Sequence, residues 1–220
     1  YPVNNIYTCV QGEGVQTGVA MVLLRLHGCA VGCPWCDTKE TWEFDTKQEV
    51  STLDEALGAT IQYVRLSAKE ICDYIIREHP GPKWVLLTGG EPAQFDVKWL
   101  VQQLQSTGYQ VAIETSGTEL GHINAGIDWV CVSPKLNMPG GKIVQTKALA
   151  SADELKHVVG RQRDITLLDE LLGTFTPKSN LQICLQPISQ SAKATQICID
   201  TVQQRGWRLS VQMHKYVGVE

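Results

Sequence analysis

Residues 83–92 read KWVLLTGGEP, a continuous apolar run that ends in two glycines, a glutamate and a proline. An apolar run of this length with a turn signal behind it predicts a buried β-strand. The next stretch, 96–108, reads DVKWLVQQLQSTG and predicts a helix that Asp96 caps and Gly108 ends. A strand without polar alternation that leads into an amphipathic helix is typical of a parallel sheet covered by helices.

The same alternation runs through the rest of the chain. Apolar, strand-like runs lie at 21–27, 109–117, 127–135, 181–187 and 207–215, with 153–159 as a further candidate. Amphipathic helices are predicted at 67–80, 163–173 and 193–206.

About six parallel strands are too few for a standard eight-stranded barrel. We therefore expect an α/β fold with an incomplete TIM-like barrel and covering helices, with an open doubly wound sheet as the alternative. Residues 1–220 are expected to form a single domain, with an inserted or irregular segment at 43–66.

Polar or glycine-rich signatures directly follow five of the expected strands. They are TGGEP (88–92), ETSG (114–117), SPK (133–135), LQP (185–187) and QMHK (212–215). The carboxyl ends of parallel strands meet at one edge of a sheet, and active sites of α/β folds form there. The sequence therefore predicts an active site built from these loops.

Composition narrows the class of protein. The chain has 220 residues, 43% hydrophobic and 19% charged, with a formal net charge of −4. This balance argues against nucleic-acid binding, which normally needs a basic face. No apolar run approaches the length of a membrane span, and the first residues lack the pattern of a secretory signal.

The cysteines divide into a solitary set and a cluster. Four solitary cysteines sit at apolar positions and are interpreted as small buried hydrophobes: Cys72, Cys131, Cys184 and Cys198. The clustered three suggest a reducing compartment, so we expect a cytoplasmic protein.

That cluster lies in residues 28–41, which read GCAVGCPWCDTKET with a C-x3-C-x2-C spacing. Three thiolates this close repel one another unless a cation holds them. A structural zinc ion would take a fourth ligand from His27 or Asp37, but the second cysteine pair of most zinc modules is absent. An iron–sulfur cluster on three cysteines would leave one iron open to a cofactor or substrate.

The triplet, with Trp35 just before its last cysteine, resembles the radical S-adenosylmethionine (SAM) superfamily. In that superfamily the open iron binds the amino and carboxylate groups of SAM, and an electron from the cluster splits SAM into methionine and a 5′-deoxyadenosyl radical. An incomplete barrel is the fold that the resemblance implies. The TGGEP motif at 88–92 is similar to the superfamily's GGE-type motif, which meets the SAM amino group.

A longer series of motifs, spanning the whole chain, resembles the 7-carboxy-7-deazaguanine synthase family. It consists of CVQGEG (9–14), RLHGC (25–29), WCDTK (35–39), ETSGT (114–118), SPKLNMPGG (133–141), DELKH (153–157), LQPISQ (185–190) and QMHKYVG (212–218). The resemblance implies a carbon–nitrogen lyase of queuosine and deazapurine biosynthesis, and thus of tRNA modification. It would convert 6-carboxy-5,6,7,8-tetrahydropterin to 7-carboxy-7-deazaguanine with loss of ammonia.

The resemblance also implies cofactors and partners. These are a [4Fe–4S] cluster, SAM, Mg2+, a small pterin substrate, a flavodoxin-like electron donor and a second copy of the chain as a homodimer. Neither a nucleic acid nor a membrane is expected as a partner. No residue is expected to act as a catalyst in its own right, because SAM supplies the radical.

The family's site residues carry over by motif. The cluster would be held by Cys29, Cys33 and Cys36. The substrate would meet Val10, Gln11, Gly12, Glu13, Arg25 and Thr88. SAM would meet Trp35, Cys36, Asp37, Gly90, Glu91, Glu114, Ser116, Ser133, Pro134, Lys135 and Gln186.

Several of these positions have ordinary structural alternatives. Thr38 resembles the family's Mg2+ ligand, but it could equally be a helix N-cap, and Asp37 is an alternative carboxylate for either role. Arg25 lies in an apolar strand and needs an anionic partner, which a substrate carboxylate or a structural ion pair would supply. Lys135 could be a solvated lysine, and His214 and Lys215 receive no role.

Two other functions compete with this interpretation. One is a radical SAM activase that makes a glycyl radical on a partner protein, which would not need the QGEG, SPK and QPISQ motifs. The other is a zinc-stabilised binding module without catalysis. A coloured, iron-containing protein would exclude the second, and activity on a pterin would exclude the first.

Overall fold

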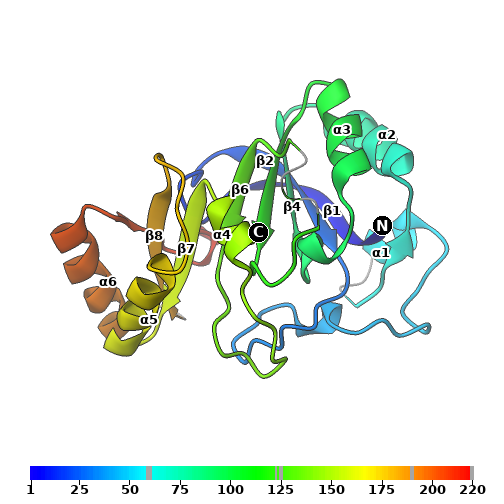
Figure 1. The fold of residues 1–220 in the computed structure, drawn as a ribbon. Coiled ribbons are helices and arrows are strands. Elements are labelled where there is room, and N and C mark those ends of the chain that lie inside the picture. Colours follow the sequence, from blue (N-terminus) through cyan, green and yellow to red (C-terminus); the bar gives the residue numbers. More distant parts are fainter. Residues whose placement is uncertain (58–60, 122, 124–125, 189–190, 219–220) are drawn as a thin grey trace.

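The computed structural model describes residues 1–57, 61–121, 123, 126–188 and 191–218, and it contains one mixed sheet (Figure 1). Its strands are β1 (Pro2–Val10), β2 (Ala20–Leu26), β3 (Val64–Arg65), β4 (Trp84–Gly89), β5 (Gln110–Thr115), β6 (Trp129–Val132), β7 (Glu154–Val159), β8 (Gln182–Pro187) and β9 (Arg208–Leu209). The helices are α1 (Leu53–Leu57), α2 (Ala68–Glu78), α3 (Lys98–Ser106), α4 (Thr146–Ala150), α5 (Gln162–Leu172), α6 (Ala192–Arg205) and α7 (His214–Val217), with 3-10 turns η1 (Lys39–Thr41) and η2 (Pro92–Gln94).

The strand order is β3-β1-β2-β4-β5-β6-β7-β8-β9, and the sheet does not close on itself. All pairings from β2 to β9 are parallel, so the described part of the chain has seven parallel strands. The expected α/β parallel architecture is confirmed. The sequence did not predict β1 and β3, which extend the sheet with antiparallel pairings.

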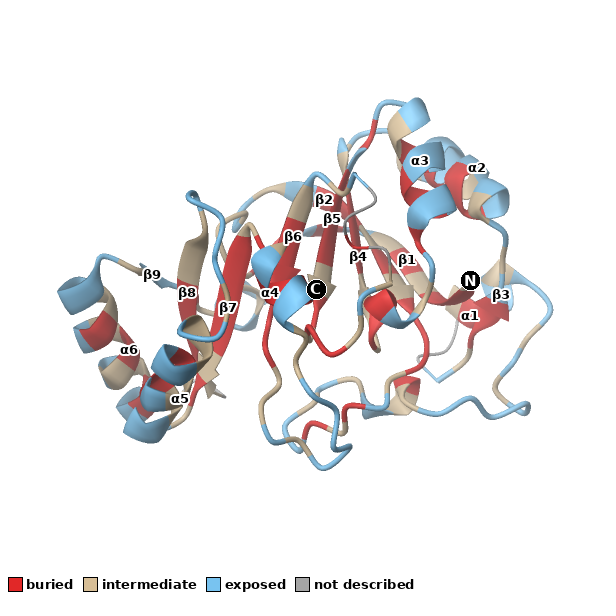
Figure 2. Cartoon of the chain, viewed as in Figure 1, coloured by how far each residue is buried: buried red, intermediate tan, exposed pale blue. Residues whose placement is uncertain are grey.

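One face of the parallel sheet carries the helices and the other faces a cavity. Alternate strand residues such as Leu24, Leu87 and Ile113 belong to one core cluster that also contains buried residues of α2 to α6. Their neighbours Leu23, Leu86 and Glu114 line the cavity instead. Covering helices on a single face suit an incomplete barrel, whereas a doubly wound sheet has helices on both. Figure 2 shows the covering helices buried on their inner side and exposed on the outer side.

The predicted helices form with small shifts at their ends. Ser67 and Glu70 make the expected capping box of α2, with Ser67 Oγ accepting from Glu70 N and Glu70 accepting from Ser67 N. At α3 the N-cap position is Val97, one residue past the expected Asp96, whose Oδ1 accepts from Lys98 N at 3.0 Å.

The expected last strand, 207–215, is wrong over most of its length. Only Arg208–Leu209 pair with β8, and the chain then turns into α7. Met213 N donates to Gly12 O at 2.8 Å, so this segment packs on the loop that follows β1 and does not extend the sheet.

The segment expected to be inserted or irregular contains the short elements α1 and β3 within loops, and residues 58–60 lie outside the described part. Tyr63, 1% exposed, packs against the ring of His27, with 4.4 Å between the ring centroids.

The four cysteines interpreted as small hydrophobes are all buried, and Cys9, for which no role was predicted, is buried as well. Among the described residues, no helix has the length and apolar character to cross a bilayer.

Candidate active site

A cavity of about 450 Å³ opens at the carboxyl ends of the parallel strands. Of the site residues expected from the motifs, all but Glu91 and Pro134 line it. Its wall also contains residues that the motifs did not single out, including Trp42, Lys156 and Gln212, together with His214 and Lys215. Residues from both ends of the chain and from most strands thus meet around one space.

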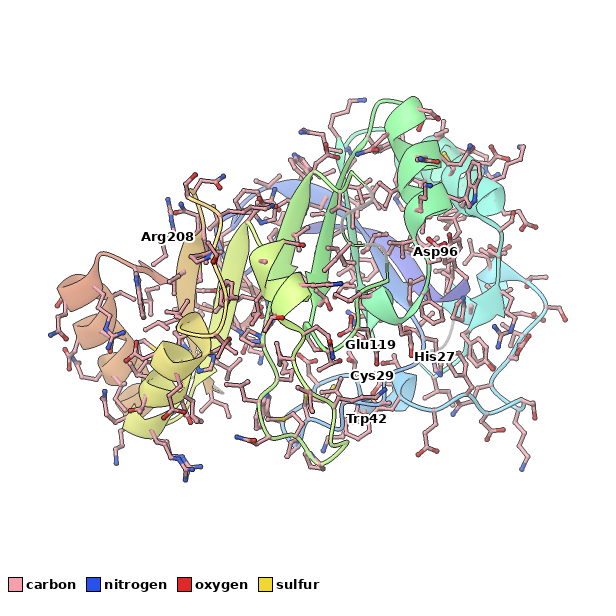
Figure 3. The ribbon with its side chains drawn as sticks, viewed as in Figure 1. His27, Cys29, Trp42, Asp96, Glu119 and Arg208 are labelled. Atoms are coloured by element: carbon pink, nitrogen blue, oxygen red, sulfur yellow. The ribbon has the colours of Figure 1, made fainter. Side chains whose placement is uncertain are left out.

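The three clustered cysteines lie on the loop after β2 and line this cavity. Figure 3 labels the first of them, Cys29, and the nearby Trp42. Gly28 and Gly32 adopt φ values of +103° and +73°, a region that favours glycine, and these turns fold the loop back on itself. Cys29 N donates to Trp42 O at 2.9 Å, which holds the loop against the chain that follows it.

Two N–H groups point at one of the sulfurs. Thr38 N and the indole Nε1 of Trp42 each donate to Cys36 Sγ at 3.4 Å. Donors of this kind stabilise negative charge on a sulfur ligand.

The remaining two thiols need a metal to ionise. Burial raises the pKa of Cys29 to about 11 and raises that of Cys33 as well. Both therefore stay protonated at neutral pH until a metal displaces the protons. Among the described residues, no group of three or more His, Cys, Asp or Glu side chains is arranged to hold a single metal ion. The donor set, its N–H donors and the open space beside it fit an iron–sulfur cluster whose fourth position is left free.

The structure disfavours the zinc alternative. His27 Nε2 lies 2.8 Å from Glu43 O, and the ring packs between Tyr63 and Phe44 outside the cavity wall. Its imidazole is thus occupied by contacts away from the cavity. A closed zinc site would need Asp37 as its fourth ligand.

The turn after β4 approaches the cysteine loop closely. Gly90 N donates to Leu26 O and Glu91 N donates to Gly28 O, both at 2.8 Å. A Cβ on Gly90 would lie 2.5 Å from the Gly28 carbonyl carbon and 3.1 Å from Cβ of Cys29. Only glycine fits here, which explains the second glycine of TGGEP without reference to a ligand.

Glu91 takes a different place from the one expected. Its side chain is 2% exposed and lies outside the cavity wall. The carboxylate accepts from Ala93 N at 2.9 Å, Thr115 Oγ1 at 2.6 Å, Ser116 N at 2.7 Å and Ser116 Oγ. The geometry therefore makes Glu91 a tie between the loops after β4 and β5 and disfavours a direct contact with SAM.

Arg25 and Thr88 are neighbours across the β2–β4 pairing, and both line the cavity. Among the residues that the structure describes, no carboxylate pairs with Arg25. A free guanidinium in a cavity wall suits an anionic ligand better than the structural ion pair that the sequence left open.

Thr38 lies at the N-cap position of η1, but its hydroxyl makes no capping hydrogen bond. The hydroxyl faces the cavity 3.6 Å from Cys36 Sγ, beside the exposed Asp37. The N-cap alternative therefore has no support from the side-chain geometry, and this oxygen is available to a ligand.

Lys135 is not a solvated lysine. Its Nζ donates to Ser133 O at 2.9 Å and to Ser133 Oγ at 2.5 Å, and burial lowers its pKa. Gln186 also lines the wall, whereas Pro134 is buried behind it.

Opposite these groups, a buried charge cluster joins β5, β7, the loop after β1 and the C-terminal segment. Lys156 Nζ lies 2.6 Å from Glu13 Oε2 and 3.0 Å from Glu114 Oε2. Gln212 Nε2 donates to Glu13 Oε1 at 2.8 Å, and Gln11 Nε2 donates to Glu114 Oε1 at 3.0 Å. Glu114 is thus hydrogen-bonded to Gln11 and shares a lysine with Glu13, which groups it with the residues expected at the substrate.

The sequence itself points to Lys156 as a residue of the site. Lys156 belongs to the DELKH motif and lies in the strand-like run 153–159. A cation in such a run needs an anionic partner, as Arg25 does. Gln212 opens the QMHK motif, but nothing in the sequence indicates its partner Glu13, which lies 199 positions away.

Comparisons with known proteins identify the family. A family model described as a 4Fe-4S single cluster domain matches residues 10–136. The chain is 46% identical over 222 residues to the 7-carboxy-7-deazaguanine synthase of Escherichia coli (strain K12), covering all of this chain and 99% of that protein. This chain belongs to the 7-carboxy-7-deazaguanine synthase family. The family member of Buchnera aphidicola subsp. Schizaphis graminum (strain Sg) is 37% identical, again over all of this chain and 99% of its own length.

The fold agrees with the family. A crystal structure of QueE from Escherichia coli matches with a TM-score of 0.91 at 46% identity, covering 97% of this chain and 94% of that chain. The resemblance read from the motifs is thereby confirmed, and so is the incomplete-barrel fold. Membership in the 7-carboxy-7-deazaguanine synthase family implies a [4Fe–4S] cluster and SAM as cofactors.

Proposed function

We propose that this chain is a 7-carboxy-7-deazaguanine synthase, a radical SAM lyase. It converts 6-carboxy-5,6,7,8-tetrahydropterin to 7-carboxy-7-deazaguanine and ammonia, for queuosine and other deazapurines. The observation that carries the proposal is one cavity with three thiols on one side and the Glu13–Lys156–Glu114 cluster on the other. When bound, the cluster and SAM supply a carbon radical that removes a hydrogen atom from a substrate held between these sides.

The chain's own residues bind and orient the substrate. Arg25 pairs with the substrate carboxylate, supported by its free guanidinium, and Thr88 lies beside it. Glu13 and Gln11 receive and present hydrogen bonds at the pterin ring, supported by their place across the cavity from the thiols.

Other groups hold the cofactors. Cys29, Cys33 and Cys36 hold the cluster, and the Thr38 hydroxyl contributes an oxygen to Mg2+ beside it, as its uncapped position suggests. The SAM-facing wall is formed by Trp35, Asp37, Gly90, Ser116, Ser133, Lys135 and Gln186, and Pro134 links two of these residues in the chain. Glu91 supports this wall through Ser116.

The proposal extends to the state and partners of the protein. Residues 1–220 work as a single domain, the protein acts as a homodimer in the cytoplasm, and a flavodoxin-like protein delivers the electron. These features rest on the family resemblance. Sedimentation of the purified protein and reduction by a purified flavodoxin test the dimer and the donor separately.

Anaerobic purification followed by iron and sulfide analysis tests the first half of the function. The expected result is a brown protein with about four irons and four sulfides per chain. Incubation with SAM, Mg2+, reductant and 6-carboxy-5,6,7,8-tetrahydropterin should then yield 7-carboxy-7-deazaguanine. A colourless zinc protein after cluster reconstitution, or an iron–sulfur protein without this product, would contradict the proposal.

A further inference from the structure

Lys156 is the most deeply buried charged group of the cavity. Its side chain is 3% exposed, and it points from β7 toward the cavity, away from the helix-covered face. An ammonium without water is costly unless partners compensate for its lost hydration. Nothing in the binding of a cluster, SAM or a carboxylate requires a cation at this point, so its role must come from its neighbours.

Those neighbours are two carboxylates that face the cavity. Nζ reaches Glu13, which follows β1, at 2.6 Å, and Glu114 of β5 at 3.0 Å. The two acids come from different strands and would repel each other without the cation between them. Lys156 therefore determines where their oxygens point.

Two amides complete the arrangement. Gln212 donates to the second oxygen of Glu13 and Gln11 donates to the second oxygen of Glu114. Each of these carboxylate oxygens can accept two hydrogen bonds and receives one from the protein, so one acceptor position on each remains for a ligand. The Lys156 ammonium, with the Gln212 amide, holds the pKa of Glu13 at about 2 despite burial.

We propose that Lys156 is a positioning residue that holds the side chains of Glu13 and Glu114 aimed into the cavity, where they receive the N–H groups of an aminopyrimidinone ring. Such a ring carries adjacent amino and ring N–H donors, which a carboxylate accepts in pairs. The inference rests on the proposed function, because a pterin contains this ring. It adds the residue that makes the ring's acceptors available.

Other charged or titratable groups surround the cluster, and a pH test must allow for them. They are Glu154 of β7, Cys131 of β6, Cys184 of β8, Cys9 of β1, Lys135 after β6, Arg25 of β2 and His214 of α7. All of them remain in a Lys156 variant, so a difference between variant and parent reports on the Lys156 partners.

The test is isothermal titration calorimetry of the cluster-loaded, SAM-bound protein with pterin-6-carboxylate. This oxidised probe keeps the aminopyrimidinone ring but has no hydrogen on carbon 6 to be removed. The variants are Lys156→Met, which keeps the length and loses the charge, and Lys156→Arg, which keeps the charge. Lys178→Met is the matched control, since Lys178 forms a more exposed ion pair with Asp153 at 2.7 Å.

For Lys156→Met we expect probe binding to weaken by roughly tenfold to a hundredfold at pH 7.5, the effect of losing a charge-assisted hydrogen bond. Binding should weaken by about another tenfold from pH 7.5 to 5.5, because Glu13, buried and without its cation, then takes up a proton. Lys156→Arg and Lys178→Met should follow the parent's pH profile. In turnover, Lys156→Met should raise KM more than it lowers kcat.

A second variant covers the case in which Lys156→Met does not fold. Lys156→Met with Glu114→Gln preserves the net charge of the three-residue cluster, and Glu13 still lacks its cation, so the pH-dependent weakening should persist. Parent-like affinity and pH profile in either folded variant would overturn the inference while leaving the function intact. Failure of the parent itself to bind the probe would overturn the function, and the inference with it.

Discussion

Replacing Gly90 by alanine tests how closely the cysteine loop and the turn after β4 are joined. The new Cβ would lie 2.5 Å from the Gly28 carbonyl carbon, closer still to its oxygen, and 3.1 Å from Cβ of Cys29. Neither neighbour is the flexible end of a side chain, so the backbone must move. That movement breaks the 2.8 Å hydrogen bond from Glu91 N to Gly28 O and displaces the first cysteine.

The cost follows from these two effects. Overpacking a tight contact costs about 1–3 kcal/mol, and the lost hydrogen bond adds about 0.5–1.5 kcal/mol. A total of about 2–4 kcal/mol corresponds to a Tm lower by roughly 4–16 °C for a protein of this size. The displaced Cys29 should also lower the iron content after reconstitution.

Gly81→Ala is the matched control, because its Cβ would meet nothing within 4 Å. Thermal unfolding of the metal-free proteins and iron analysis of the reconstituted ones provide the comparison. If Gly90→Ala matched Gly81→Ala in both Tm and iron content, the claim that only glycine fits at position 90 would be refuted.

Three further changes probe other contacts. Trp42→Phe removes the indole donor to Cys36 Sγ and should make the cluster's reduction potential more negative by about 40 mV. This shift equals about 1 kcal/mol for one electron, the value of one hydrogen bond, and an EPR-monitored redox titration measures it. Glu91→Gln replaces an acceptor of four hydrogen bonds by a group of the same shape and should cost about 2–4 kcal/mol in urea unfolding; a loss below about 0.5 kcal/mol would contradict the tie. Burial lowers the pKa of His157, so the unfolded chain binds the proton more readily and stability should fall as pH drops through about 6.5. His157→Gln should reduce this fall by up to about 1.4 kcal/mol between pH 7.5 and 5.5, measured by unfolding at the two pH values.

The location of the site was predictable because it depends on a local pattern. An apolar run marks a buried strand wherever it occurs, and parallel strands bring their carboxyl ends to one edge. Cys29, Ser116, Ser133 and Gln186 each follow or end such a run, so their meeting at one cavity needed no knowledge of long-range contacts.

The antiparallel edge was not predictable in the same way. β1 reads PVNNIYTCV, and the asparagines interrupt any apolar or alternating pattern. Asn4 is nonetheless 3% exposed, because its side chain donates to Gln62 O at 2.8 Å. A partner 58 positions away thus makes a polar residue acceptable in a buried strand.

The charge cluster and Glu91 show the same limit at the site. Lys156 meets Glu13 and Glu114 across 143 and 42 positions, and neither separation follows from a motif. For Glu91 the motif predicted a ligand contact, but its carboxylate is already hydrogen-bonded to Ser116 and Thr115 in the folded chain. A motif identifies which residues matter, whereas the hydrogen-bond partners decide what each one does.

The two sides of the cavity differ in rigidity, and the difference suits their tasks. Glu114 and Lys156 project from sheet strands, which position side chains more precisely than loops do, as recognition of a flat ring requires. The thiols lie on the loop after β2, which has glycine turns at Gly28 and Gly32. Such a loop can close its three sulfurs around iron without disturbing the sheet, so cluster assembly should leave the geometry of the carboxylate side unchanged.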